Sequence, residues 1–434
     1  MEAFKLKESF LMGCATAATQ IEGGDTNNSW YDWSEQRRVK DGSTSLRADD
    51  HYRLYREDAQ LMQDMGLEIY RMGLEFSRIE PQRGVFDPVA IEHYKDELRL
   101  LNEKGIRVLV TLHHFANPMW FEHMGAFENS ESVRIFTQYV EYVAEQFGDL
   151  CCEYVTINEP NVYAVNGFTF GEWPPAKKSV AATFKVMKNM AKAHLAAYET
   201  IHRVRKEHGF AGRTMVGFAN HYRVFVPYRS RNLIDKAVAK LFDLAFQGAV
   251  TDAMAWGKFS FPLGLFSRKK GDFCDYFGIN YYTRSAMRGF ENTFLPDKPV
   301  NDLGWELYPE GITLLSERFY KRYGKPVWIT ENGTCDSEDA FRTQYLYDHL
   351  KALAQTSVPV ERYYHWTLMD NFEWLEGESA RFGLVKVDYE TQERTVRTSG
   401  RFFSEVIKNK GVTEEMCRAY FGESGTVQNR ESVV

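Results

Sequence analysis

Several features that define other protein classes are missing from this 434-residue sequence. Its six cysteines include no Cys-x-x-Cys pair, and only Cys151 and Cys152 are close together, so neither a zinc site nor a disulfide framework is expected. No apolar run reaches the roughly 18 residues that a membrane span needs. The formal net charge of −7 disfavours nucleic acid as a partner, because phosphate binding requires a basic surface.

The amino-terminal residues resemble an export signal only superficially. Lys5 and Lys7 precede a short apolar segment at residues 10–14. That segment is shorter than the roughly 7–15 apolar residues of a signal peptide, and Glu8 lies at its edge. We therefore expect a strand here, no export, and a cytoplasmic protein whose cysteines remain free thiols.

The chain contains no linker and no low-complexity segment, and short apolar runs alternate with long helical patterns along its length. Such alternation is typical of βαβ units and a parallel sheet. Eight strands with intervening helices predict an α/β fold, a (β/α)8 TIM barrel, as a single domain over residues 1–434, with a partly flexible tail at 411–434. The expected strands are 10–15, 69–73, 108–112, 154–157, 215–219, 276–279, 327–330 and 363–366. The expected helices include 50–65, 90–103, 132–147, 179–207, 235–254, 311–323 and 340–354.

Polar side chains follow nearly every expected strand. They are amides, carboxylates and imidazoles, and in such barrels the carboxyl ends of the strands carry the catalytic groups. Because these ends meet at one mouth, we expect the side chains to converge there. They include Gln20, His114, Asn158, Glu159, Asn220, His221, Asn280, Tyr282, Glu331 and Trp366.

Two of these residues are carboxylic acids in distinctive contexts. Glu159 follows the fourth strand within Asn158-Glu159-Pro160, and Glu331 follows the seventh within Thr330-Glu331-Asn332-Gly333. The fourth and seventh strand exits face each other across the mouth, so one cleft can hold both groups. Cleavage of a glycosidic bond requires such a pair of carboxyl groups on either side of the bond.

These motifs resemble those of the family 1 glycoside hydrolases, which include β-glucosidases and β-galactosidases. Asn158-Glu159-Pro160 is similar to the acid/base motif of that family, and Thr330-Glu331-Asn332-Gly333 to its nucleophile motif. Asn371-Phe372-Glu373-Trp374 is similar to its motif for recognising the glycone, the sugar of the non-reducing side. The likeness runs from about residue 10 to about residue 388, nearly the whole chain.

The resemblance implies a retaining, exo-acting β-glycosidase that works without a cofactor or metal. It implies that Glu159 acts as acid and base and Glu331 as nucleophile, and therefore that Glu159 starts protonated and Glu331 ionised. Arg71 and Asn280 would support catalysis, Arg71 by holding Glu331 anionic. The substrate-binding residues that it implies are Gln20, His114, Asn158, Tyr282, Trp366, Glu373 and Trp374.

The same resemblance favours one class of substrate but leaves other classes open. The phosphoglycosidases of the family use a serine and a lysine near the recognition motif, whereas Glu373 stands here and residues 373–382 contain no lysine. This favours unphosphorylated β-glycosides and a β-glucosidase, although Ser379 and Arg381 keep a phospho-β-glycosidase open. Gln20 and Glu373 tolerate epimers at the 4-position, so the sugar itself stays open.

Two other functions are compatible with part of this pattern. A catalytically inactive sugar-binding barrel would not need both Glu159 and Glu331, and a transglycosidase would need the same residues. Adjacent His113 and His114 point to opposite faces of a strand, so they cannot share a metal ion. Phe115 stands where the family usually has Trp, which leaves the aglycone, the leaving group, unassigned. We expect a small carbohydrate as partner, with no nucleic acid and no membrane.

Overall fold

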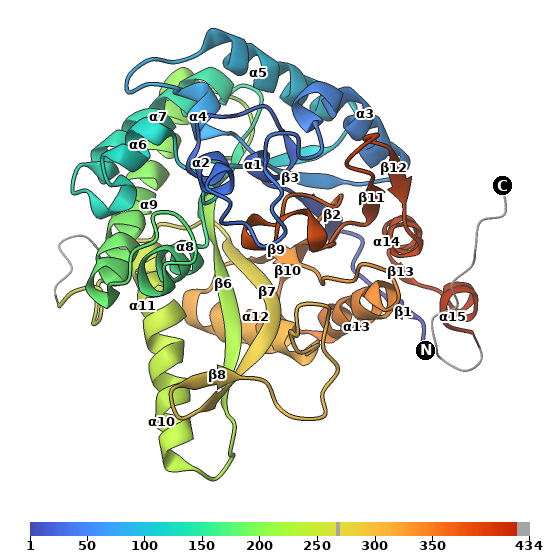
Figure 1. Cartoon of the computed structure of the whole chain (residues 1–434). Helices are drawn as coiled ribbons and strands as arrows, with labels where there is room; N and C mark the ends of the chain where they lie inside the picture. Colours follow the sequence, from blue (N-terminus) through green and yellow to red (C-terminus); the bar gives the residue numbers. More distant parts are fainter. Residues whose placement is uncertain (266–269, 423–434) are drawn as a thin grey trace.

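The computed structural model describes residues 1–265 and 270–422, and its centre is a closed barrel of eight parallel strands (Figure 1). Around the barrel the order is β2-β3-β4-β5-β6-β7-β9-β10, and β10 pairs with β2 to close it. The predicted (β/α)8 barrel is thereby confirmed. Its strands are β2 (Leu11–Ala15), β3 (Ile69–Gly73), β4 (Arg107–Thr111), β5 (Glu153–Asn158), β6 (Met215–Pro227), β7 (Phe277–Arg288), β9 (Val327–Asn332) and β10 (Val360–Trp366).

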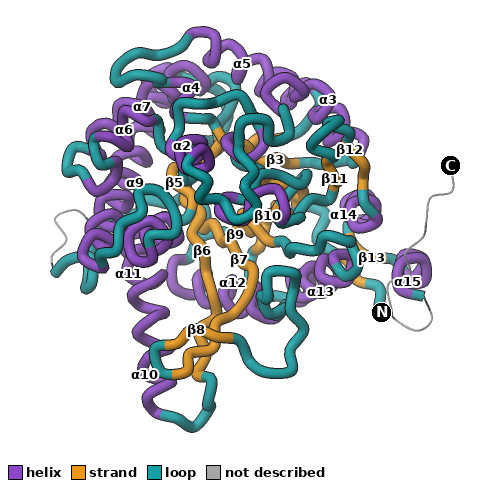
Figure 2. The backbone as a smooth tube through the Cα atoms, viewed as in Figure 1, coloured by secondary structure: helices purple, strands orange, loops and turns teal. Residues whose placement is uncertain are grey.

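Helices surround the barrel between the strands (Figures 1 and 2). The long ones begin and end within two residues of the predicted bounds, except in the segment after β6 and for α14, for which no helix was predicted. They are α3 (His51–Asp64), α5 (Pro88–Glu103), α7 (Ser132–Phe147), α9 (Val180–His208), α10 (Leu233–Phe242), α11 (Ala249–Trp256), α12 (Glu310–Tyr323), α13 (Arg342–Gln355) and α14 (Thr398–Asn409).

Shorter elements complete the chain. Short helices lie in the connecting segments, and the small strands form the pairs β1–β13 and β11–β12, while β8 pairs with the end of β7. The short helices are α1 (Ala18–Ile21), α2 (Ser29–Glu35), α4 (Phe76–Ile79), α6 (Met119–His123), α8 (Pro160–Ala164), α15 (Glu414–Phe421), η1 (Ala126–Glu128), η2 (Val165–Phe170), η3 (Asp243–Gly248) and η4 (Trp374–Ser379); the small strands are β1 (Phe4–Lys5), β8 (Glu291–Thr293), β11 (Val385–Val387), β12 (Arg394–Val396) and β13 (Gly411–Val412).

The predicted tail at 411–434 falls partly within the described chain. Strand β13 pairs antiparallel with β1, and α15 follows it, so residues 411–421 are mostly regular structure. The rest of the predicted flexible segment, 423–434, lies outside the described residues. No helix in the two described ranges combines the length and the apolarity that crossing a bilayer requires.

The sequence interpretation was incomplete after the fifth strand. Strands β6 and β7 were expected to span only 215–219 and 276–279, but they continue beyond the barrel as a paired ribbon that projects with β8 and α10 (Figures 1 and 2). The single helix expected at 235–254 is divided by the π-helix η3. The hydrophobic pattern does not indicate either feature, because the β6 residues of the ribbon are half-buried and a π-turn shifts the helical period.

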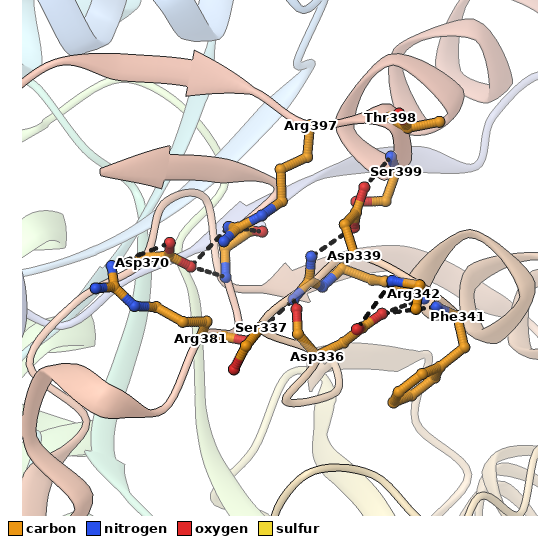
Figure 3. Close-up of polar contacts among 12 residues, drawn as sticks. Asp336, Ser337, Asp339, Phe341, Arg342, Asp370, Arg381, Arg397, Thr398 and Ser399 are labelled. Atoms are coloured by element: carbon orange, nitrogen blue, oxygen red, sulfur yellow. Dashed lines mark hydrogen bonds and ion pairs between the residues drawn. The ribbon is translucent and has the colours of Figure 1, made fainter. Parts of the chain in front are cut away.

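A buried network of charges holds the loops that follow β9 and β10 (Figure 3). The fully buried Asp370 accepts hydrogen bonds from Arg397 at 2.8 Å and Arg381 at 3.3 Å. Arg342 donates to Asp339 at 2.6 Å and to the Arg381 carbonyl oxygen at 2.9 Å. The network therefore fixes the segment between Trp366 and Arg381, which carries the predicted recognition motif.

We expect Asp370→Asn to lower the free energy of unfolding by about 3–5 kcal/mol, because it leaves two partly buried guanidinium groups without their carboxylate. Urea denaturation of the full chain measures this. Asp64→Asn is the matched control, since Asp64 is exposed and its carboxylate accepts a hydrogen bond from Gln60; its stability should stay within about 0.5 kcal/mol of the parent. Equal stability of the two variants would contradict the prediction.

Candidate active site

A cleft of about 450 Å³ opens at the carboxyl ends of the barrel strands. Seven of the eleven residues predicted for the site line it, and they come from strand exits far apart in the sequence. The cleft is therefore assembled by barrel closure rather than by any local segment. The seven are His114, Glu159, Tyr282, Glu331, Trp366, Glu373 and Trp374.

Glu331 lies in β9, where hydrogen bonds hold both of its carboxylate oxygens. Arg71 in β3 donates to Oε1 at 2.5 Å, and the Tyr282 hydroxyl donates to Oε2 at 2.6 Å. The backbone at Gly333 packs closely against the backbone at Trp366, since a Cβ atom on Gly333 would lie 1.8 Å from the Trp366 carbonyl oxygen. Only glycine fits there, which accounts for the glycine two residues after Glu331.

Some of the groups around Glu331 raise its pKa and others lower it. Burial raises the pKa of Glu331 to about 7; the positive charge of Arg71 and the hydrogen bond from Tyr282 lower it, whereas the negative charge of Glu159 raises it. The ionised form of Glu331 at neutral pH therefore depends on Arg71 and Tyr282.

Glu159 directly follows β5 and takes a left-handed backbone conformation, with φ of 43°. Its Oε1 atom accepts a hydrogen bond from Asn280 Nδ2 at 2.8 Å and lies 3.3 Å from His221 Nδ1. His221 Nε2 in turn accepts from Arg223 Nε at 3.0 Å, which leaves the proton of this imidazole on Nδ1, facing Glu159. The orientation of Glu159 is thus set by residues of β6 and β7.

We expect Tyr282→Phe to move the acid limb of the pH profile of kcat/KM upward by about one unit. The hydroxyl stabilises only the ionised form of Glu331, so its loss raises the pKa of Glu331, and the protonated form persists to higher pH. Initial rates on an aryl β-glucoside across the pH range measure the limb.

The neighbouring Tyr281→Phe is the matched control. The Tyr281 hydroxyl donates to the Tyr308 carbonyl oxygen at 2.5 Å, away from both carboxylates, so this variant should keep the acid limb of the parent. If Tyr282→Phe also keeps it, the hydroxyl of Tyr282 does not control the ionisation of Glu331.

The other four predicted residues lie directly behind the lining and are fully buried; they are Gln20, Arg71, Asn158 and Asn280. Asn158 Oδ1 accepts from Arg71 at 2.6 Å and from Asn280 at 3.0 Å, and Asn158 Nδ2 lies 2.9 Å from His114 Nε2. The structure therefore brings all eleven predicted residues into one connected group, and these four act on the cleft through residues that line it.

Glu373 lines the cleft and is hydrogen-bonded to Gln20, which lies behind it. Gln20 Nε2 donates to Glu373 Oε2 at 3.1 Å and to Asn371 Oδ1 at 3.0 Å. Within the described chain, the buried Gln20 Oε1 atom has no hydrogen-bond partner. Burial raises the pKa of Glu373 to about 8, although the hydrogen bonds from Gln20 and Trp366 oppose this. Together the two side chains provide the adjacent donors and acceptors that sugar hydroxyl groups require.

Aromatic rings enclose this part of the cleft. The ring of His114 lies 5.7 Å from Trp366 and 5.6 Å from Trp374. Phe115 fills the space between Trp173 and Trp374, at 4.9 and 5.1 Å. His113, by contrast, points away and lies 3.0 Å from Asn117 Oδ1. The described residues contain no group of three or more side chains arranged to hold a metal ion.

Sequence reasoning missed most of the outer cleft. Its walls include Trp173, Arg223 and Trp305, as well as the phenylalanines at 225, 242 and 246. His221 was noted at a strand exit but was not assigned a role. The only available signal was the continued alternation of β6 past residue 219, which places Arg223 and Phe225 on the same face of the ribbon as His221.

Comparison with known proteins agrees with this geometry. The model of glycosyl hydrolase family 1 matches residues 3–412. The structure of a beta-glycosidase from Pyrococcus horikoshii is 34% identical, with a TM-score of 0.88 over 97% of this chain and 99% of that one. Beta-glucosidase A from Thermotoga maritima is 31% identical over 95% of this chain and 100% of its own length. The galactolipid galactosyltransferase SFR2 from Arabidopsis thaliana is 31% identical over 83% of this chain and 58% of its own.

Proposed function

The chain belongs to glycosyl hydrolase family 1 and is a glycoside hydrolase, and from this premise we propose that it is a retaining, exo-acting β-glucosidase for unphosphorylated β-glycosides. One observation carries the proposal. Glu331, held by Arg71 and Tyr282, and Glu159, held by Asn280, line the same cleft. A double displacement requires such a pair, with the two carboxyl groups about 5–5.5 Å apart.

The proposed reaction has two steps. Glu331 attacks the anomeric carbon while Glu159 gives its proton to the departing glycosidic oxygen, so a covalent glycosyl-enzyme forms and the aglycone leaves as an alcohol. Glu159, now ionised, removes a proton from water, and the resulting hydroxide attacks the same carbon and releases Glu331. The product sugar keeps the β configuration because the carbon is inverted twice.

The recognition loop supports an unphosphorylated sugar. Arg381, the cation that kept a phosphate-binding role open, donates to Asp370 (Figure 3) and to the Val387 carbonyl oxygen. The Ser379 hydroxyl donates to the Glu376 carbonyl oxygen. Lys40 lines the cleft but is paired with the Glu376 carboxylate at 2.5 Å. Arg381, Ser379 and Lys40 are thus already paired within the protein, and a sugar phosphate would have to displace their partners.

A panel of aryl β-glycosides, with and without a 6-phosphate, tests the substrate class. We expect the unphosphorylated β-glucoside to have the highest kcat/KM. Proton NMR of the first product tests the stereochemistry, with the β anomer expected before mutarotation. A first product with the α anomer would exclude double displacement, and no turnover of any glycoside would favour a sugar-binding barrel.

We expect Glu373→Ser to reduce kcat/KM for the unphosphorylated β-glucoside by about 10- to 150-fold. This corresponds to the roughly 1.5–3 kcal/mol of a hydrogen bond that involves a charged group. Glu378→Ser, in the same loop but outside the cleft lining, is the matched control and should keep the parent value. An unchanged constant in Glu373→Ser would remove this residue from the sugar site.

Two further points belong to the proposal. Transfer of the glycosyl group to an alcohol instead of water uses the same residues, and likeness to a galactosyltransferase favours testing it by product analysis with added alcohol. A cytoplasmic location is supported by six cysteines that are all free, and cell fractionation tests it.

A further inference from the structure

The helix α10 carries apolar residues on two sides. On its inner side, Val238 and Ala239 pack on Met287 of β7, with Phe225 and Phe242 beside them. On its outer side, four large apolar side chains are exposed on α10 and η3: Leu233 by 78%, Ile234 by 65%, Leu241 by 42% and Leu244 by 42%. A helix that is apolar on both sides is normally covered on both.

The turn between β7 and β8 extends this exposed surface. Phe290, 72% exposed, lies in that turn, and the adjacent Gly289 N–H donates to Asp235 of α10 at 2.9 Å. The turn and the start of α10 are therefore in contact at the end of the projecting ribbon (Figures 1 and 2). We call the five exposed residues the outer face; they are Leu233, Ile234, Leu241, Leu244 and Phe290.

The charge around the outer face is opposite in sign to that of the whole chain. Residues 229–244 contain four basic side chains and two acidic ones, whereas the chain has a net charge of −7. Both acids are already paired, Asp235 with Arg229 at 2.8 Å and Asp243 with Arg318 at 2.7 Å. Lys236 and Lys240, both exposed and one helical turn apart, flank the apolar stripe. An apolar stripe flanked by lysines is typical of helices that lie in the surface of an anionic bilayer.

The outer face also adjoins the cleft. Phe242 and Phe246 line the cleft and alternate along the same helix with Leu241 and Leu244 of the outer face. Phe225 of β6 lines the cleft beneath them. Apolar surface thus continues from the outside of α10 into the outer part of the cleft.

We propose that the outer face docks on an anionic lipid surface and presents the cleft to β-glycosides whose aglycone is embedded in that surface. This rests on the proposed glycosidase function. A second copy of this chain is a poorer occupant, because a twofold contact through the outer face would bring the same lysines of both copies together. An anionic lipid surface can bury the apolar stripe among its acyl chains and pair its charged headgroups with the adjacent lysines.

Flotation of the full chain with vesicles tests the docking. Vesicles of equal parts phosphatidylcholine and phosphatidylglycerol should carry the protein to the top of a gradient, and phosphatidylcholine alone should carry much less. Ile234→Gln/Leu241→Gln/Phe290→Gln should weaken the partition by more than about tenfold. Lys236→Gln/Lys240→Gln should weaken it by about fivefold per lysine, and added salt should do the same.

The matched control is Val85→Gln/Val89→Gln. Val85 and Val89 are 52% and 73% exposed, just before and at the start of α5, which lies far from β8 and α10 (Figure 1), so this variant should float like the parent. Failure of the parent to float, or equal flotation of the Ile234/Leu241/Phe290 variant, overturns the proposal. If the parent does not float, and light scattering shows that the parent is a dimer and the Ile234/Leu241/Phe290 variant a monomer, the outer face binds a second copy of the chain instead.

Activity separates this inference from the function on which it rests. A soluble aryl β-glucoside should be cleaved equally by the parent and the Ile234/Leu241/Phe290 variant, because none of these three residues lines the cleft. Dodecyl β-glucoside embedded in the anionic vesicles should be cleaved at least about tenfold more slowly by the variant. Equal rates on the embedded substrate overturn the inference, whereas no activity on the aryl glucoside overturns the proposed function.

Discussion

Glu331→Gly should reduce hydrolysis of an aryl β-glucoside by about 10⁵–10⁶-fold, the scale on which loss of a catalytic nucleophile acts. No other carboxylate is held as Glu331 is, between Arg71 and Tyr282, among the described residues that line the cleft. The glycine also opens space beside the anomeric carbon. We therefore expect added azide to restore turnover and to produce the α-glycosyl azide, formed by a single inversion.

The azide product is the internal control of this experiment, since only a folded enzyme with an intact sugar site can form it. Circular dichroism should match that of the parent. Retention of near-normal hydrolysis would show that another residue is the nucleophile, and a β-glycosyl azide would assign Glu331 to acid/base chemistry.

Glu159→Ala should show an effect that depends on the leaving group. For a phenyl β-glucoside, whose oxygen must be protonated as it leaves, kcat/KM should fall by about 10²–10⁴-fold. For a dinitrophenyl β-glucoside the first step needs no acid, so kcat/KM should stay within about tenfold of the parent while kcat falls because water is no longer activated. A burst of dinitrophenol should then precede slow turnover, and azide should give the β-glycosyl azide.

The matched control is Glu317→Ala, a change of the same kind on the exposed side of α12, which should leave both substrates unaffected. A uniform loss on the two substrates would contradict the assignment of Glu159 as the acid. It would indicate a general role in binding, which could be shared with His221 and Asn280.

Most of the barrel could be predicted from the sequence, because each strand is a short apolar run bounded by turns and each long helix has a clear period. The strand at 69–73 was predicted with its observed bounds, as was the helix at 132–147. The prediction was poorest where elements leave the barrel. Beyond Tyr222 the residues of β6 that pair with β7 in the ribbon are only half-buried, so burial does not give this part of the strand an apolar run.

The sequence by itself determined the fold class, the family likeness and the two carboxylates, because the motifs around Glu159 and Glu331 are local and their strand exits must share one mouth. The tertiary structure decided what surrounds them. Arg71 and Glu331 are separated by 260 positions, and only closure of the barrel places the guanidinium 2.5 Å from the carboxylate. The same closure sets His221 beside Glu159, and the ribbon brings Phe242 into the cleft while leaving Leu241 exposed. Hydrogen bonds and charge interactions act over a few ångströms in space, whatever the separation along the chain, and so they are specified by the packed fold.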